Sequence, residues 1–369
     1  PEIRFKGFTE AWEQRKAKEL FVSTADKGYP ELPVLSATQD RGMIRRDENS
    51  INIFHDKKNE AGYKRVLPGQ FVIHLRSFQG GFAHSTIEGI TSPAYTVFGF
   101  SEPEKHDSEY WKYVFTSKSF IRRLETVTYG IRDGRSISYE EFLTLGFVYP
   151  SKAEQTAIAR YLDKLSDLIT LHQRKYDKLT NVKKSMLEKM FPKNGSNVPE
   201  IRFKGFTEAW EQRKLGELCN ITTGKLDANA MVSDGQYDFY TSGIDVFKID
   251  VAAFEGPAIT IAGNGASVGY MHLADGKFNA YQRTYVLTDF LADRQFLNVA
   301  IGNELPNKIQ EEVRGSGIPY IVLNMLTDLA IPFPSHEEQY AIGVYFQQLD
   351  NLITLHQRKY DKLTNVKKS

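Results

Sequence analysis

The chain has 369 residues, of which 41% are hydrophobic and 25% are charged, so it is long enough for two globular domains with a core each. No apolar run reaches the roughly 20 residues that a membrane-spanning helix needs, and the single cysteine, Cys219, excludes an internal disulfide and a zinc site built from cysteines. The net charge is +1, so any nucleic-acid-binding surface must be a local patch. Because the first residues also lack an apolar signal segment, we expect a cytoplasmic protein.

Two segments of the sequence occur twice. The head, Pro1–Lys16, recurs letter for letter as Pro199–Lys214, and the tail, Leu168–Ser185, recurs as Leu352–Ser369. Between each head and tail lies a divergent middle, residues 17–150 in the first copy and 215–334 in the second. Self-similarity of this kind marks a duplicated unit. We therefore expect two modules of one fold, related by a pseudo-two-fold axis.

The first middle predicts a mixed α+β domain with short strands. Gln70–Ile73 is a run of β-branched and aromatic residues that leads into a glycine-rich turn, and such runs between turn residues are typical of strands. Ala258–Ile261 and the turn after it repeat this order in the second middle. The two middles are thus expected to share a fold while they differ in most side chains.

Each module ends in a segment that predicts a long helix with a coiled-coil seam. Apolar residues and one histidine recur there at alternating spacings of three and four, which is a heptad pattern. The seam positions are Ile158, Leu162, Leu165, Ile169, His172, Tyr176 and Leu179 in the first copy, and Ile342, Phe346, Leu349, Ile353, His356, Tyr360 and Leu363 in the second. Under a two-fold relation the two helices pack antiparallel. We interpret the two histidines as packing residues rather than metal ligands.

These patterns predict the domain boundaries. The two globular domains are expected at residues 1–150 and 199–334, the two long helices at 151–191 and 335–369, and a linker at 192–198. Each helix follows a Pro-Ser dipeptide whose serine can cap the first turn. Glu154 or Glu338 stands three residues further on, as in a capping box.

Motifs of the enzymes that modify DNA or hydrolyse ATP are missing from the sequence. It contains no Pro-Pro dipeptide of the kind that holds a target base in N-methyltransferases, no GxxxxGK[ST] phosphate loop, and no HExxH or Cys/His cluster for a metal. We therefore expect a protein that is not an enzyme and that itself holds no metal and no cofactor. A nuclease site of scattered carboxylates leaves no such pattern, so a stand-alone endonuclease stays an alternative.

Three further segments, taken with the repeats, carry a resemblance to a known family. They are Ile201–Phe206 with Trp210, Leu329–Pro334, and Glu338–Ile342, where an EQ-x2-I start leads into the long helix. Over the whole chain this arrangement resembles the specificity subunits of type I restriction-modification systems. The resemblance implies two target recognition domains that each read one part of a split DNA site, separated by two long antiparallel helices.

The resemblance also implies the partners. They are double-stranded DNA, two methyltransferase (modification) subunits that bind S-adenosylmethionine, and motor-nuclease (restriction) subunits in the full complex, with no membrane. ATP and magnesium would then belong to the partner subunits only. An alternative from another class is a structural adaptor whose helices join two protein-binding modules without DNA.

Residues that could contact DNA are polar side chains on turns after strands, because arginine matches guanine, and asparagine or glutamine matches adenine, in the major groove. The candidates in the first middle are Arg76, Ser77, Gln79, Arg132 and Arg135, with Arg41, Arg45 and Arg46 as phosphate contacts. Those in the second are Asn264, Ser267, Tyr281, Gln282, Arg283, Arg314 and Ser316. For each one, a solvated loop residue is the alternative interpretation.

Overall fold

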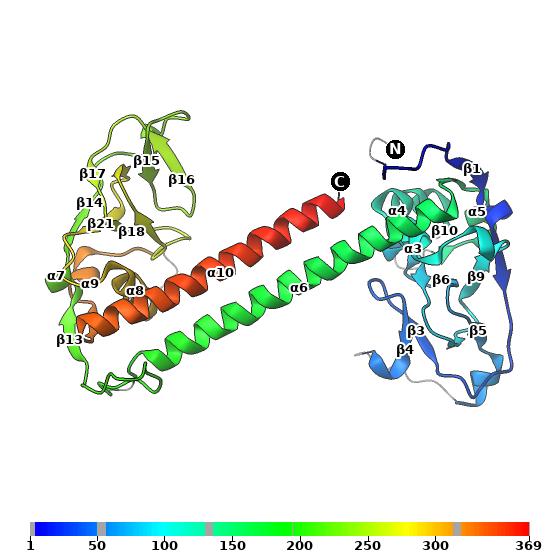
Figure 1. Cartoon of the computed structure of the whole chain (residues 1–369), viewed down its shortest axis with the longest axis horizontal. Helices are drawn as coiled ribbons and strands as arrows, with labels where there is room; N and C mark the ends of the chain where they lie inside the picture. Colours follow the sequence, from blue (N-terminus) through cyan, green and yellow to red (C-terminus); the bar gives the residue numbers. More distant parts are fainter. Residues whose placement is uncertain (1–3, 50–56, 130–135, 194, 313–318, 369) are drawn as a thin grey trace. The chain divides into compact units, whose positions relative to one another are not determined.

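The computed structural model describes residues 4–49, 57–129, 136–193, 195–312 and 319–368. It divides into two compact units, Pro1–Asp167 and Leu168–Ser369, whose elements are labelled in Figure 1. Within the described residues, no helix combines the length and the apolar character that a membrane crossing requires.

The first unit is built on a four-stranded antiparallel sheet in the order β2-β9-β6-β7. Its strands are β1 (Glu13–Lys16), β2 (Phe21–Thr24), β3 (Leu35–Ala37), β4 (Met43–Arg45), β5 (Lys64–Val66), β6 (Phe71–Ile73), β7 (Ala83–His84), β8 (Gly89–Thr91), β9 (Thr96–Phe100), β10 (Thr128–Tyr129), β11 (Ser136–Ile137) and β12 (Gly146–Tyr149). Its short helices are α1 (Ala17–Leu20), α2 (Ser77–Gly80), α3 (Ser108–Thr116), α4 (Lys118–Leu124) and α5 (Tyr139–Thr144), with 3-10 turns at Arg46–Glu48, Lys57–Gly62, Pro103–Lys105 and Glu125–Val127. The core between sheet and helices is rich in aromatic side chains, among them Phe71, Phe98, Trp111 and Phe115, all fully buried.

The second unit repeats this sheet as β14-β21-β18-β19, again antiparallel throughout. Its strands are β13 (Glu211–Lys214), β14 (Asn220–Thr223), β15 (Tyr237–Tyr240), β16 (Val246–Ile249), β17 (Phe254–Glu255), β18 (Ala258–Ala262), β19 (Met271–Ala274), β20 (Lys277–Ala280), β21 (Thr284–Thr288) and β22 (Ala330–Phe333). Its helices are α7 (Leu215–Leu218), α8 (Arg294–Glu312) and α9 (Leu323–Thr327), with a 3-10 turn at Ala228–Ala230. β6 and β18 therefore occupy the same place in the two sheets, and the expected α+β class and shared fold are confirmed.

The divergent middles differ around this common sheet. The single helix α8 stands where the first unit has α3 and α4. The second unit adds a second four-stranded sheet, β16-β15-β20-β17, whereas the first has the two-stranded pairs β3-β4 and β5-β8. The common sheet is thus a scaffold on which different loops are mounted.

The repeated heads form the same strand pairing in both units. β1 pairs antiparallel with β12 in the first unit, and β13 pairs with β22 in the second. β12 and β22 are the strands that lead directly into the long helices. The head therefore joins each globular domain to the beginning of its helix.

A buried ion pair fixes each head to the first turn of its long helix. Arg4 donates from Nε and Nη2 to the two carboxylate oxygens of Glu154 at 2.7 and 2.6 Å. Arg202 donates from the same two atoms to the two carboxylate oxygens of Glu338, both at 2.7 Å. Both glutamates are only 1% exposed. The hydrogen bonds from Arg4 lower the pKa of Glu154, and Trp210 Nε1 also donates to Glu338.

The glutamine after each glutamate binds the globular domain. Gln155 Oε1 accepts the backbone N–H of Asp107 at 2.9 Å, and Gln339 Oε1 accepts that of Asp293 at 3.0 Å. Each of these aspartates accepts a backbone N–H of the first turn of α3 or α8. We call Arg4, Glu154 and Gln155, and their equivalents Arg202, Glu338 and Gln339, the helix clamps. The clamps hold both helices to their domains through the same contacts.

The long helices are α6 (Lys152–Met190) and α10 (His336–Lys368). Ser335 Oγ accepts the N–H of Glu338 at 3.4 Å, so the predicted serine cap is present at α10. The prediction of a capping box is wrong, because Glu154 and Glu338 bind the head arginines instead. A guanidinium with two aligned donors is a stronger partner for a carboxylate than one backbone N–H.

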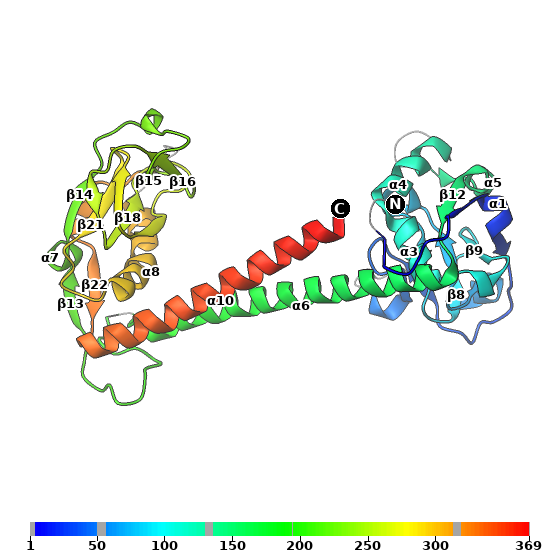
Figure 2. The same ribbon diagram turned by 45° about the horizontal axis from the view of Figure 1, so that its top comes forward.

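Within the second unit, α10 and the later part of α6 run side by side in opposite directions (Figures 1 and 2). Nδ1 of His172 lies 2.8 Å from Nδ1 of His356, and Lys183 Nζ donates to Asp350 Oδ1 at 2.5 Å. Because the two histidines are equivalent positions of the repeat, the local two-fold axis of the tails passes between their rings. Every seam position named above is buried or half-buried.

Candidate nucleic-acid interface

A cavity of about 210 Å³ lies in the second unit where four chain segments meet. Gly263 N donates to the carbonyl of Arg283 at 2.8 Å, and Ile321 N donates to the carbonyl of Gly263 at 2.7 Å. The segment after β18 is therefore held between the turn before β21 and residues 319–321. A Cβ atom at position 263 would lie 2.4 Å from the Arg283 carbonyl oxygen, so this close approach requires glycine.

Three of the predicted DNA contacts, Asn264, Gln282 and Arg283, line this cavity together with Tyr320. Oδ1 of Asn264 is shielded from solvent and has no hydrogen-bond partner within the described residues. Gln282 and Arg283 are exposed. The described lining contains one cation, two amides and two tyrosines but no carboxylate, a composition that suits a nucleic acid.

The other candidates of the second middle have different surroundings. Tyr281 is half-buried, and its N–H donates to the carbonyl of Tyr240 at 2.9 Å. Ser267 is half-buried in the turn between β18 and β19, where its carbonyl accepts the N–H of Tyr270 at 2.9 Å. Arg314 and Ser316 lie outside the described residues.

In the first unit, two of the predicted segments touch each other. Gln39 Nε2 donates to Gln79 Oε1 at 3.0 Å, which joins the turn at residues 38–42 to α2. Arg41 on that turn is exposed, and so is Arg76 directly before α2. α2 also contacts β11, the strand that follows Arg132 and Arg135, which themselves lie outside the described residues. Arg41, Arg76 and Gln79 thus come together at one end of the domain.

The predicted phosphate contacts differ in their partners. Arg45 pairs with Asp47 at 3.3 Å, with 51% and 68% of the two side chains exposed, and such surface pairs contribute only about 0–1 kcal/mol. Arg45 can therefore exchange its partner for a phosphate. Nε and Nη1 of Arg46 are shielded from solvent without a partner in the described part of the chain.

The structure corrects the prediction for Ser77. This residue is fully buried, and its hydroxyl accepts the N–H of His74 at 2.8 Å. The serine closes the turn between β6 and α2 and cannot reach a groove of DNA. For the remaining candidates, contact with DNA stays a prediction.

The paired histidines of the seam show the effect of their surroundings. Burial is the main cause that lowers the pKa of His172, and the positive charges of Lys359 and Lys175 lower it further. Burial is also the main cause that lowers the pKa of His356, and electrostatic repulsion by His172 and the same two lysines lowers it further. The described residues contain no group of three or more His, Cys, Asp or Glu side chains that could hold a metal ion.

Sequence reasoning missed four exposed leucines on the long helices. Leu168 and Leu171 on α6 are 42% and 44% exposed, and their repeat equivalents on α10, Leu352 and Leu355, are 43% and 44% exposed. The heptad pattern selects seam positions and passes over apolar residues on the outer face. Their identical recurrence in both tails is the signal that could have found them.

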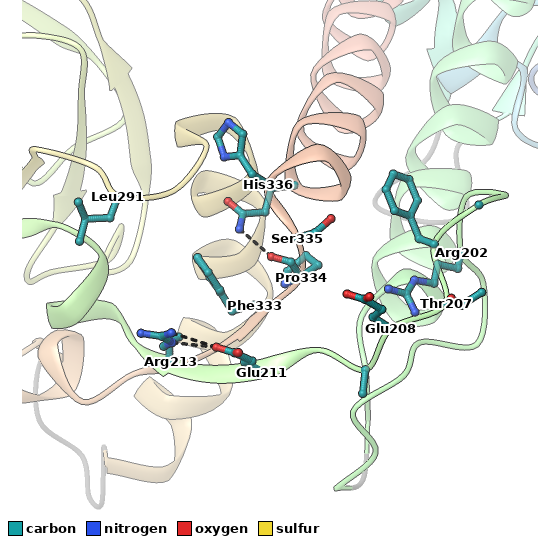
Figure 3. A pocket seen from close by; sticks show the side chains of 14 residues that line it. Arg202, Thr207, Glu208, Glu211, Arg213, Leu291, Phe333, Pro334, Ser335 and His336 are labelled. Carbon is teal, nitrogen blue, oxygen red and sulfur yellow. Dashed lines mark hydrogen bonds and ion pairs between the residues drawn. The ribbon is translucent and has the colours of Figure 1, made fainter.

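A larger cavity of about 510 Å³ lies between the second head and the start of α10 (Figure 3). The Arg213–Glu211 ion pair and the hydrogen bond from Gln339 Nε2 to the carbonyl of Pro334 stand at its wall. Glu208 also lines it. Its lining thus contains two carboxylates and two arginines, and its head residues recur identically in the first copy.

Comparisons with known proteins agree with this architecture. Residues 207–365 match the family described as type I restriction modification DNA specificity domain. The chain is 43% identical over 144 residues to the type I restriction enzyme EcoDI specificity subunit of Escherichia coli, which covers 39% of this chain and 31% of that protein. It is 24% identical over 255 residues to the type I restriction enzyme MjaVIII specificity subunit of Methanocaldococcus jannaschii, and this match covers 59% of this chain and 58% of that protein. The chain thus spans less than two thirds of the length of either relative.

The fold is similar to the crystal structure of a type I restriction-modification system S subunit from M. genitalium. The TM-score is 0.60 at 16% identity, and the match covers 100% of this chain and 96% of that one. This similarity concerns the fold of the whole chain, whereas the family model matches residues 207–365. The resemblance to the specificity subunits of type I restriction-modification systems is therefore confirmed, and residues 207–365 match the family described as type I restriction modification DNA specificity domain.

Proposed function

We propose that this chain is the sequence-specific DNA-binding specificity subunit of a type I restriction-modification complex. Two observations carry the proposal. Two copies of one scaffold each gather different polar and cationic loop residues, and the second copy matches the model of a DNA specificity domain family. Two similar modules can grip two segments of a duplex. Because their loops differ, the two parts of the target differ in sequence.

The functional division of the chain follows the predicted boundaries. Residues 1–150 and 199–334 are the target recognition domains, residues 151–191 and 335–369 are the spacer helices, and residues 192–198 are the linker. The helix clamps support this division, because identical contacts at both junctions fix each recognition domain to its own helix in the same way.

The contacts with DNA divide into two kinds. Asn264 and Gln282 in the second domain, and Arg76 and Gln79 in the first, read bases, whereas Arg283 contacts a phosphate beside them. Arg41, Arg45 and Arg46 bind phosphates, which positions the duplex without specifying its sequence. Apart from the half-buried Asn264 and Arg46, these residues are exposed, and they lie on loops and short elements around the sheets, which supports these roles.

Two methyltransferase subunits dock on the outer faces of the spacer helices. The exposed leucine pairs Leu168/Leu171 and Leu352/Leu355 support this. The two leucines of each pair are three residues apart and therefore neighbours on the helix surface, adjoining exposed apolar residues can form a contact site, and both copies present the same pair. S-adenosylmethionine belongs to those subunits, and ATP and magnesium belong to the restriction subunits. The chain itself binds and orients, forms and breaks no bond, and works in the cytoplasm where the DNA is.

The test is to co-express the chain with a cognate methyltransferase subunit and to map methylated adenines in the host genome. A split motif is expected. Replacing residues 17–150 with the middle of another allele should change one part of the motif and leave the other. A stable complex that leaves no motif would favour the structural adaptor, and magnesium-dependent DNA cleavage by the isolated chain would favour the endonuclease.

A further inference from the structure

Asn264 is held rigidly at the cavity of the second unit. Its neighbour Gly265 donates its N–H to the carbonyl of Pro319 at 3.1 Å, and Gly263 is hydrogen-bonded to both Arg283 and Ile321. Tyr285, on β21 of the central sheet, donates its hydroxyl to the carbonyl of Ile321 at 2.9 Å. The backbone on both sides of Asn264 is therefore tied to the sheet, as accurate recognition requires.

The amide of Asn264 has an acceptor that no described residue uses. Oδ1 is shielded from solvent and finds no donor among the described residues. An unpaired buried amide oxygen destabilises the folded chain, and an entering N–H donor would remove that cost. The described residues thus leave this acceptor unpaired beside the cavity that Asn264 lines.

The surroundings of this amide select the kind of molecule that can supply the donor. Tyr320 is 60% exposed and offers an aromatic face, and the exposed Arg283 adds a positive charge. Two larger cavities of the same unit differ. One is lined by Glu208 and Glu211, and the other, of about 720 Å³, is mostly apolar and includes Asp250. Both of these cavities also have cationic residues in their lining, but the Asn264 cavity is the one of the three whose described lining holds a cation and no carboxylate, which suits a polyanion such as DNA.

We propose that this cavity receives the major-groove edge of one adenine of the target, with Asn264 as the residue that determines specificity there. Adenine presents an amino donor beside the N7 acceptor, and a carboxamide matches both at once, with Oδ1 accepting and Nδ2 donating. Arg283 binds a neighbouring phosphate. The inference rests on the proposed function, which it deepens by naming a base and its reader.

The experiment measures competition binding of the complex between this chain and its methyltransferase subunit. Duplexes carry the mapped motif with each position replaced in turn by the other three bases. Asn264→Ala is expected to reduce the preference for adenine at one position of the second part of the motif by on the order of 5- to 100-fold. All other positions should keep their preferences. Asn220→Ala, an exposed residue at the far end of β14, is the matched control.

A second pair of variants separates base reading from phosphate binding and from misfolding. Arg283→Gln should weaken binding to all sequences alike and reduce the salt dependence by about one phosphate contact. Asn264→Asp keeps the shape of the side chain but loses the Nδ2 donor, so it should also lose the adenine preference. This variant provides the test if Asn264→Ala fails to fold.

Three outcomes have distinct meanings. If the wild-type complex shows no split motif, the proposed function fails before the cavity is tested. If both Asn264 variants keep every base preference, or weaken binding equally for all four bases, the adenine assignment is wrong. The adenine assignment is also wrong if the Asn264 variants lose their preference at a motif position where the wild-type complex prefers a base other than adenine.

Discussion

Replacing Glu338 with alanine should destabilise the second unit far more than an ordinary surface ion pair would. Glu338 is 1% exposed and Arg202 12%, so the substitution leaves a buried guanidinium without its carboxylate. The indole N–H of Trp210 loses its acceptor as well. Breaking a buried ion pair from one side costs about 3–5 kcal/mol, against a typical domain stability of about 5–15 kcal/mol.

The assay is urea unfolding of the whole chain followed by circular dichroism, with the free energy of unfolding taken from the transition of the second unit. Glu211→Ala is the matched control, because Glu211 and Arg213 form an ion pair with 65% and 49% of their side chains exposed. Its removal should cost about 0–1 kcal/mol. Glu154→Ala should produce the large loss in the first unit instead.

A double substitution tests whether the cost comes from the unpaired charge. Arg202→Leu combined with Glu338→Leu removes both charges and should cost much less than Glu338→Ala alone. The reasoning is refuted if Glu338→Ala costs no more than Glu211→Ala, or if the double leucine variant is as unstable as the single alanine variant.

Three further predictions concern the helices and the core. The pKa values of His172 and His356 are lowered in the folded chain, so the unfolded chain binds protons more readily, and the contribution of the two histidines to stability is complete above the ordinary pKa of about 6.5 and is lost as the pH falls below it. Changing both histidines to glutamine should remove this part of the pH dependence of urea unfolding. An unchanged pH dependence would contradict the prediction. Leu352→Lys should remove one of two methyltransferase subunits from the complex in native mass spectrometry, whereas Thr354→Lys, also exposed, should retain both. Burial raises the pKa of Cys219 to about 12, so iodoacetamide should label this thiol at neutral pH only after urea unfolds the second unit; rapid labelling of the native chain would contradict its buried position.

The sequence alone determined the duplication, the α+β class and the long helices. Repeats can be read letter by letter, and a heptad is a local pattern, because residues three and four apart share one face of a helix. The antiparallel pairing of the tails, with His172 against His356, also follows from the symmetry of identical segments.

Only the tertiary structure decided how each helix is attached and where the loop residues meet. Arg4 and Glu154 stand 150 positions apart, and no local pattern distinguishes a glutamate that caps a helix from one that binds a distant arginine. The cavity at Asn264 is closed by segments that the sequence separates, and Ser77 faces inward because its hydroxyl satisfies a backbone N–H. Local spacing fixes which face of an element a residue occupies, but the partner it finds there depends on how the chain folds back on itself.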